Sequence, residues 1–126
     1  MKNPEKYTPL ILRIGLASVL LWFGINQLIE PAAWSGLVNE FLENIIPAIT
    51  LVRINGVAEI VMAVFLILGL FTRIVAVIHA LHLLIIISAL GYNDIAVRDF
   101  GLMVGAIALA FSGGGYLSLD EKLKKQ

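Results

Sequence analysis

Cysteine is absent from this 126-residue chain, and charged residues make up only 14% of it. Without cysteine, the chain can form no disulfide and can supply no thiolate to an iron–sulfur cluster or a zinc ion. Its nine Lys and Arg residues balance nine Asp and Glu residues, so it lacks the basic surplus typical of nucleic-acid-binding proteins. Thiol redox chemistry within the chain is excluded, and a nucleic-acid partner is not expected.

Apolar residues make up 60% of the chain, and the mean hydropathy is +0.94. Soluble domains contain about 45–50% apolar residues. The apolar residues here form four continuous runs, which is typical of spanning helices and not of the alternating strands of a membrane barrel. Because lipid cannot hydrogen-bond to the backbone, we predict an all-α, polytopic membrane protein, a four-transmembrane-helix bundle with residues 1–126 as its single domain.

The apolar runs predict spans at about 9–29, 53–71, 74–90 and 96–112. Between the first two spans, residues at about 32–46 place apolar side chains at helical spacing, with polar ones on the other side. This pattern predicts a short amphipathic interfacial helix anchored by Trp34, which is either a plain connector or a lid over a cavity. In the first span, helical spacing predicts one inward-facing stripe: Arg13, Ala17, Leu20, Gly24 and Gln27.

Charges outside the spans are distributed unequally between the two sides of the predicted bundle. One side carries basic residues: Lys2, Lys6, Arg73, Lys122, Lys124 and Lys125. The loops on the other side carry acids: Glu30, Glu40, Glu43 and Asp94. By the positive-inside rule, we predict a protein of the cell membrane with both termini in the cytoplasm.

The second predicted span contains a single acid, Glu59. A charge at the centre of a spanning helix costs about 2.5–3.5 kcal/mol, so polar groups there usually face the bundle interior. Asn55, one turn away, shares the face of Glu59 and can hydrogen-bond to it. At about 1.5 Å per residue from the cytoplasmic edge, Glu59 and His82 lie at the same depth, and Arg13 and His79 share a shallower one.

Two neighbouring charges in the fourth span, Arg98 and Asp99, point in different directions. We expect Arg98 to turn inward, toward Glu59 or Asn55. Asp99 is expected to pair with Arg53 or with another subunit. Near them runs a stripe of small residues that includes a GxxxG pattern, and we favour its packing within the bundle over packing between subunits. This stripe consists of Gly101, Gly105, Ala108 and Ser112.

Together these polar groups predict a seam through the bundle that either binds a ligand or is a buried polar cluster. In one interpretation the groups satisfy one another and fix the helix register. In the other they line a pocket for a quinone-like or lipid-like ligand, or form a proton path. No metal or haem site is predicted, because two histidines three positions apart on one helix cannot face each other across a haem. The seam consists of Glu59, Asn55, His82, His79, Arg13, Gln27 and Arg98, with Asp99, Arg53 and Arg73 as a second tier.

Four segments taken together resemble the DoxX family of small four-helix membrane proteins. The segments are LRIGLASVLLWFGINQL, NGVAEIVMAVFLILGLFTRIVA, RDFGLMVGAIALAFSGGG and the final YLSLD. The first span departs from the family's usual glycine–lysine ending and reads Gly24-Ile25-Asn26-Gln27. The resemblance implies that the family's polar positions are Arg13, Glu59, Arg73, Arg98 and Asp99.

The family takes its name from a subunit of a terminal quinol oxidase and thiosulfate–quinone oxidoreductase complex, and some members associate with redox-stress proteins at the membrane. The resemblance therefore implies an accessory or scaffold subunit of a quinone-linked redox complex, with a quinone as the candidate cofactor and a membrane redox protein as the partner. The chain carries no catalytic motif of its own and is at most a subunit of an oxidoreductase complex. The alternative is a stand-alone protein that binds a small ligand, lipid or quinone, or that conducts protons. As a transporter, such a small protein would need to be a homo-oligomer.

Overall fold

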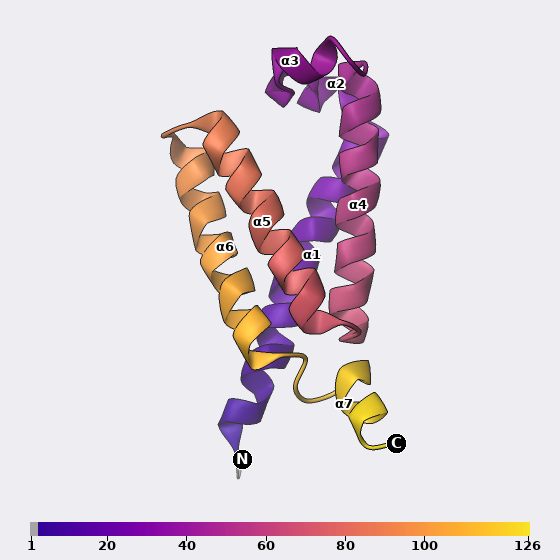
Figure 1. The fold of residues 1–126 in the computed structure, drawn as a ribbon, viewed down its shortest axis with the longest axis vertical. Helices are drawn as coiled ribbons and strands as arrows, with labels where there is room; N and C mark the ends of the chain where they lie inside the picture. The colour runs from indigo at the N-terminus through magenta and orange to yellow at the C-terminus, as the bar shows by residue number, and fades with distance from the viewer. Residues whose placement is uncertain (1–2) are drawn as a thin grey trace.

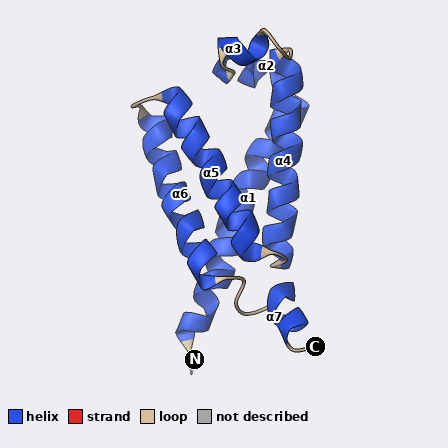
Figure 2. Cartoon of the chain, viewed as in Figure 1, coloured by secondary structure: helices blue, strands red, loops and turns tan. Residues whose placement is uncertain are grey.

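The computed structural model describes residues 3–126, which fold into four long helices and several shorter helical segments (Figure 1). These helices are α1 (Thr8–Ile29), α4 (Ala48–Leu68), α5 (Thr72–Leu90) and α6 (Asp94–Ser112). Each is long and apolar enough to cross a membrane, and the described residues contain no strand (Figure 2). The prediction of an all-α, four-transmembrane-helix bundle is confirmed. Lys2, one of the basic residues used to predict the orientation, lies outside the described residues.

The four helices pack as two pairs, α1 with α4 and α5 with α6. Both termini lie at one end of the bundle, which we call the terminal end, and the two pairs diverge toward the opposite, open end (Figure 1). A short 3-10 turn (Pro4–Tyr7) precedes α1 at the terminal end. Side chains from all four helices meet in one buried core in the half of the bundle nearer the termini: Leu16, Ala17, Leu20, Met62, Ala63, Leu66, Val75, Ala76, Ala80, Ala106 and Leu109.

Helices α1 and α4 touch backbone to backbone at Gly24 and Gly56. A Cβ added at Gly24 would lie 2.8 Å from the carbonyl oxygen of Gly56, and one added at Gly56 would lie 2.9 Å from that of Gly24. Neither position has room for a side chain, so glycine at both allows the two helices to approach this closely. The predicted inward stripe of α1 is confirmed, since all five of its residues are buried.

The small-residue stripe of α6 makes no comparable contact. A Cβ added at Gly101 would meet no atom of another described segment within 4 Å, and one at Gly105 would meet only two leucine side chains, at 3.9 and 4.0 Å. Ala108 and Ser112 are exposed. The prediction that this stripe packs inside the bundle is wrong, because α6 turns a different face, with Ala106 and Leu109, toward its neighbours.

The connection between α1 and α4 differs from the single amphipathic helix predicted for residues 32–46. The side chain of Asn39 accepts a hydrogen bond from the Phe41 N–H, which starts a new helical turn at that point. Trp34 packs edge to face on Trp22 and Phe23, and these contacts tie the connection to the end of α1. The connection comprises three short pieces: α2 (Pro31–Trp34), a 3-10 turn (Ser35–Leu37) and α3 (Glu40–Glu43).

The boundaries of the second span also differ from the prediction. Helix α4 begins at Ala48, five residues before the predicted start, directly after Pro47. It ends at Leu68 and is followed by the capping residue Gly69, whose φ of 66° lies in the left-handed region that favours glycine. The polar residues of this span therefore lie further from its start than the sequence suggested.

Gly56→Ala is expected to lower thermal stability in detergent, by about 1–3 kcal/mol, because the added methyl group would press on the Gly24 carbonyl. Gly101→Ala is the matched control, since the same change in an open part of a helix should leave stability unchanged or raise it by up to about 1 kcal/mol. Thermal unfolding of both variants and the wild type in one detergent makes the comparison. Equal stability of the two variants would contradict the proposed role of the glycine contact.

Candidate functional site

Glu59 of α4 is the centre of a hydrogen-bonded cluster that three helices build. Its Oε2 accepts a hydrogen bond from Gln27 Nε2 of α1 at 3.0 Å, and its Oε1 accepts one from Asn55 Nδ2 at 3.2 Å. His82 of α5 places its Nε2 3.2 Å from the same Oε1. Glu59 is only 6% exposed, so these partners replace the water that burial removes. We call Gln27, Asn55, Glu59 and His82 the polar network.

The glycine contact explains why the polar network can form between α1 and α4. Gln27 follows Gly24 by one turn, and Asn55 directly precedes Gly56. Because the backbones touch there, the short amide side chains can bond to each other across the interface, with Asn55 Nδ2 donating to Gln27 Oε1 at 2.8 Å. Gln27 thereby holds Oε2 of Glu59 on the α1 side, while Oε1 contacts His82 of α5.

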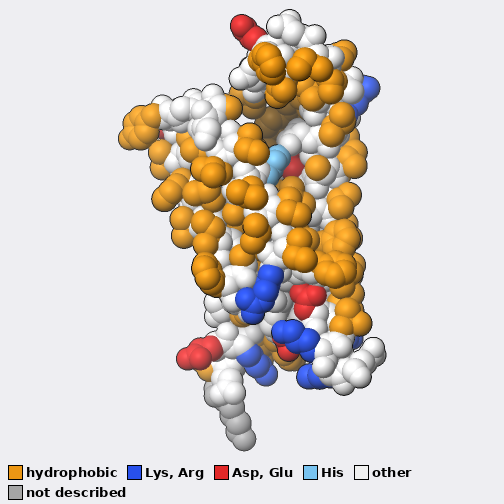
Figure 3. Space-filling model, viewed as in Figure 1, with side chains coloured by type: hydrophobic (Ala, Val, Ile, Leu, Met, Phe, Trp, Pro, Cys, Tyr) orange, Lys and Arg blue, Asp and Glu red, His pale blue; other side chains and the backbone are white. Residues whose placement is uncertain are grey.

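The polar network is accessible from a hollow between the two helix pairs. The His82 side chain is 20% exposed and that of Glu59 is 7% exposed. Figure 3 shows histidine surface beside a carboxylate in a hollow below the α2–α3 connection. Within residues 3–126, His82 and Glu59 form the only histidine–carboxylate contact of this kind. A molecule entering the hollow would therefore meet the imidazole of His82 first.

His79 lies one turn from His82, nearer the terminal end. It is 2% exposed, and neither of its ring nitrogens has a hydrogen-bond partner in the described chain. Its ring stacks with that of His82, with centroids 6.5 Å apart and planes inclined by 29°. The two rings extend the polar row from Glu59 toward the core. The described residues contain no group of three or more histidines and acids placed to hold a metal ion.

Asp99 turns inward and Arg98 turns outward, the reverse of the prediction. Asp99 is 5% exposed, whereas 51% of the Arg98 side chain is exposed. Arg98 donates to Asp99 Oδ1 from Nε and Nη2, at 3.3 and 3.1 Å, and its guanidinium lies 5.0 Å from the centre of the Phe23 ring. The predicted inward turn of Arg98 and the predicted pairing of Asp99 with Arg53 are therefore wrong. The long arginine side chain can reach outward while its short neighbour stays buried.

Arg13 is fully buried but lies outside the polar network. Its Nη1 donates to the carbonyls of Leu66 and Ile67, both at 3.0 Å. Its Nη2 donates to the carbonyls of Tyr116 and Leu117, at 3.0 and 3.2 Å. Carbonyls in the last turn of a helix accept no hydrogen bond from a later turn of that helix. Arg13 donates hydrogen bonds to two such carbonyls at the end of α4. Arg13 therefore joins α1, the end of α4 and the segment after α6.

Arg73 has a similar role at the end of α6. Its Nη1 donates to the carbonyls of Ala110 and Phe111, at 3.1 and 2.6 Å. Unlike Arg13, Arg73 is exposed, and so is Arg53 near the start of α4. Within the described residues, none of these three arginines hydrogen-bonds to the polar network. The three arginines, which were predicted to belong to the seam, therefore lie outside the polar network.

The C-terminal helix α7 (Leu119–Lys124) is attached to the start of α5. Asp120 Oδ1 accepts from the Phe71 N–H at 2.8 Å, and its Oδ2 accepts from the Thr72 N–H at 2.9 Å. Burial raises the pKa of Asp120, but hydrogen bonds from Thr72 and Phe71 and the charge of Lys124 outweigh it, so this pKa lies below its ordinary value. No local pattern indicated this cap, because the acid and the helix it caps are 48 residues apart.

The helices that build the polar network fall within a stretch shared with a known family. A family model described as DoxX matches residues 8–92. The chain belongs to the DoxX family. The matched stretch of this DoxX protein runs from α1 through α5, so it includes the whole polar network, whereas α6 and the C-terminal segment lie outside it. Membership and the four apolar helices together identify a multi-pass membrane protein. Comparisons with curated proteins and with solved structures gave no match.

Asp120→Asn is expected to remove a pH-dependent part of the stability of this DoxX protein. Because folding lowers the pKa of Asp120 from its ordinary 3.8, the unfolded chain takes up the proton more readily. The ionised cap therefore stabilises the fold above about pH 4, typically by about 1 kcal/mol, and this stabilisation is lost as the pH falls further.

Melting temperatures in detergent at pH 7 and pH 3 test this expectation. The difference between wild type and Asp120→Asn should be larger at pH 7. Glu121→Gln is the control, since its backbone N–H contacts Ser118 but its carboxylate caps no helix. If the melting temperature of the wild type exceeds that of Asp120→Asn by the same amount at both pH values, the ionised carboxylate of Asp120 does not stabilise the start of α5.

Proposed function

We propose that this DoxX protein is an accessory subunit of a membrane-associated, quinone-linked redox complex, and that its polar network contacts the quinone head group. The observation that supports this proposal most is the position of Glu59, held by side chains from α1, α4 and α5 beside a hollow. A quinone head group offers oxygens that accept hydrogen bonds, and its reduced form offers hydroxyls that donate them. The polar network contains both donors and acceptors and lies among apolar helices.

The residues of the polar network have distinct roles in this proposal. Gln27 and Asn55 orient the carboxylate of Glu59. His82 and Glu59 share one contact of 3.2 Å, so a proton can pass between Nε2 and Oε1 without movement of either helix. The chain has no cysteine to hold an iron–sulfur cluster, and in this proposal the electrons are carried by the cofactors of another subunit.

A second candidate is a stand-alone membrane protein that binds a small ligand or relays protons. The stacking of His79 on His82 favours it, because the two rings extend the polar row beyond Glu59 toward the terminal end. Arg13 does not extend this row, since its Nη1 and Nη2 donate to backbone carbonyls. A short relay or a ligand pocket therefore fits the contacts better than a seam that runs through the whole bundle.

Glu59→Gln is expected to lower the amount of quinone, and of a redox partner, that co-purifies with the protein in mild detergent by about tenfold or more. The reason is that hydrogen bonds to a charged group contribute about 1.5–3 kcal/mol. Glu40→Gln, which removes an exposed acid of α3, is the control and should behave like wild type. Mass spectrometry of the bound proteins, and of the extracted quinones and lipids, measures both quantities.

Three outcomes decide between the candidates. A defined redox partner together with Glu59-dependent quinone supports the accessory-subunit proposal. A protein that purifies alone with a stoichiometric ligand supports the stand-alone candidate and rejects the first. If Glu59→Gln changes only the melting temperature, the polar network serves to fix the helix register, and both functional proposals fail.

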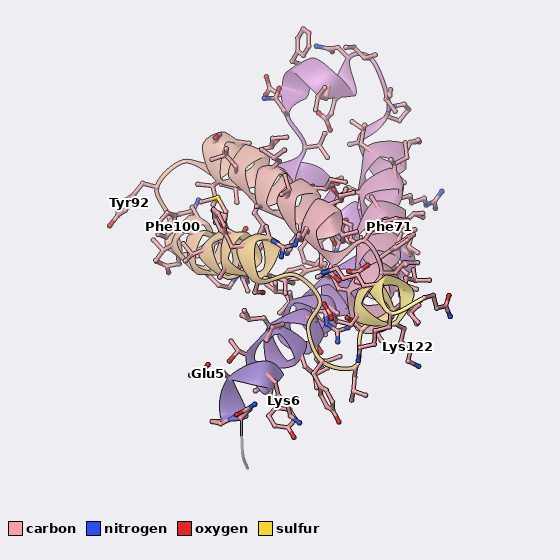
Figure 4. All side chains as sticks on the ribbon, turned by 60° about the horizontal axis from the view of Figure 1, so that its bottom comes forward. Glu5, Lys6, Phe71, Tyr92, Phe100 and Lys122 are labelled. Carbon is pink, nitrogen blue, oxygen red and sulfur yellow. The ribbon has the colours of Figure 1, made fainter. Side chains whose placement is uncertain are left out.

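We also propose that the protein lies in the cell membrane with both termini in the cytoplasm. Figure 4, which brings the terminal end forward, shows Lys6 on the turn before α1 and Lys122 on α7. Arg73 lies in the first turn of α5 at the same end, whereas the open end carries acids such as Glu43 of α3 and Asp94 at the start of α6. This charge asymmetry supports a cytoplasmic terminal end.

A single cysteine at position 94, introduced as Asp94→Cys, is expected to react with a membrane-impermeant maleimide added outside intact cells. The native chain has no cysteine, so the label reports only this site. Lys122→Cys is the control and should react only after the cells are opened. Labelling of position 94 solely from the cytoplasmic side would reverse the proposed orientation.

A further inference from the structure

Two pockets meet at Arg73, on the side of the bundle where α5 and α6 face outward. The first has a volume of about 430 Å³ and lies at the terminal end, among the start of α5, Gly113, Gly114 and α7. The second has a volume of about 520 Å³ and runs between α5 and α6. Arg73 lines both, so the two pockets adjoin at this residue. We call the first the head-group pocket and the second the acyl groove.

The head-group pocket carries two cations and one anion. The oxygens of Asp120 accept hydrogen bonds from the backbone at the start of α5. Arg73 uses Nη1 to cap α6, and its Nε and Nη2 have no hydrogen-bond partner in residues 3–126. Lys124 contacts Glu121 at 3.4 Å, but these side chains are 67% and 43% exposed, so their pairing is weak. The pocket therefore offers cationic donors to a phosphate.

The acyl groove is lined by apolar side chains apart from Arg73 at its end. They include Val77, Leu81 and Leu84 of α5, and Met103, Ile107 and Phe111 of α6. From Arg73 to Leu84 the groove follows α5 for eleven residues, or about 16 Å. One leaflet contributes about half of a hydrocarbon core that is roughly 30 Å thick. The groove thus extends from the polar boundary to about the middle of the membrane.

We propose that these two pockets together bind one anionic phospholipid of the leaflet at the terminal end. Its phosphate lies on Arg73 and Lys124, and one of its acyl chains lies in the acyl groove. Figure 3 shows basic side chains at the lower edge of the apolar surface on this face, which is where lipid phosphates meet the hydrocarbon region. The polar pocket alone would suit a free phosphate, but its position next to an apolar groove one leaflet long, with Arg73 lining both, favours the lipid. This site is separate from the polar network.

Native mass spectrometry of the detergent-purified chain, titrated with phosphatidylglycerol or with phosphatidylcholine of the same chain length, tests the proposal. The wild type should bind phosphatidylglycerol more tightly. Lys124→Gln should weaken that binding about fivefold, since one basic group near the membrane surface is lost. Lys122→Gln is the matched control on the same helix, because Lys122 does not line the head-group pocket. Arg73 is not the test position, because its substitution would also remove the cap on α6.

A second pair of variants tests the acyl groove. Ala110→Phe should fill it and weaken the binding of both phospholipids, whereas Ala108→Phe, at an exposed position of α6 outside the groove, should not. Equal affinity of the wild type for the two phospholipids, equal effects of the two lysine variants, or unchanged binding to Ala110→Phe would overturn the proposal. Binding of inorganic phosphate that displaces phosphatidylglycerol would assign the head-group pocket to a free anion instead.

Discussion

The contact between the backbones of Gly24 and Gly56 sets the position of the polar network. With a side chain at either position, α1 and α4 would stand further apart, and Gln27 could not bond to Asn55 and Glu59 together. Burial of the carboxylate depends on those bonds, because an unpaired charge within lipid is strongly unfavourable. The presentation of Glu59 to His82 therefore depends on two residues that have no side chain.

The fold and much of the polar network could be predicted because helical periodicity determines which residues of one helix share a face. The inward stripe of α1 followed from spacing alone, as did the common face of Asn55 and Glu59. Depth along the helix then placed His82 level with Glu59, and the two are in contact. These inferences need only the geometry of single helices and the thickness of a membrane.

Contacts between helices that are distant in sequence could not be predicted in this way. Periodicity could not show which neighbour α6 faces, so the directions of Arg98 and Asp99 were reversed. Nor could it show that Arg13 would meet four carbonyls from two other segments. Asp120 and the start of α5 are joined only by the path of the chain after α6. Each of these contacts depends on the packing of the whole bundle.

The length of the Glu59–His82 hydrogen bond depends on the angle between the two helix pairs. The shared core joins the two pairs in the half of the bundle nearer the termini, and Ala80, the last core residue of α5, lies just before His82. His82 is ten residues along α5, about 15 Å from its start, so a rotation of about 5° displaces it by about 1.3 Å. That displacement is enough to break a bond of 3.2 Å. The Glu59–His82 contact therefore depends on the spacing of the two helix pairs as well as on the side chains that make it.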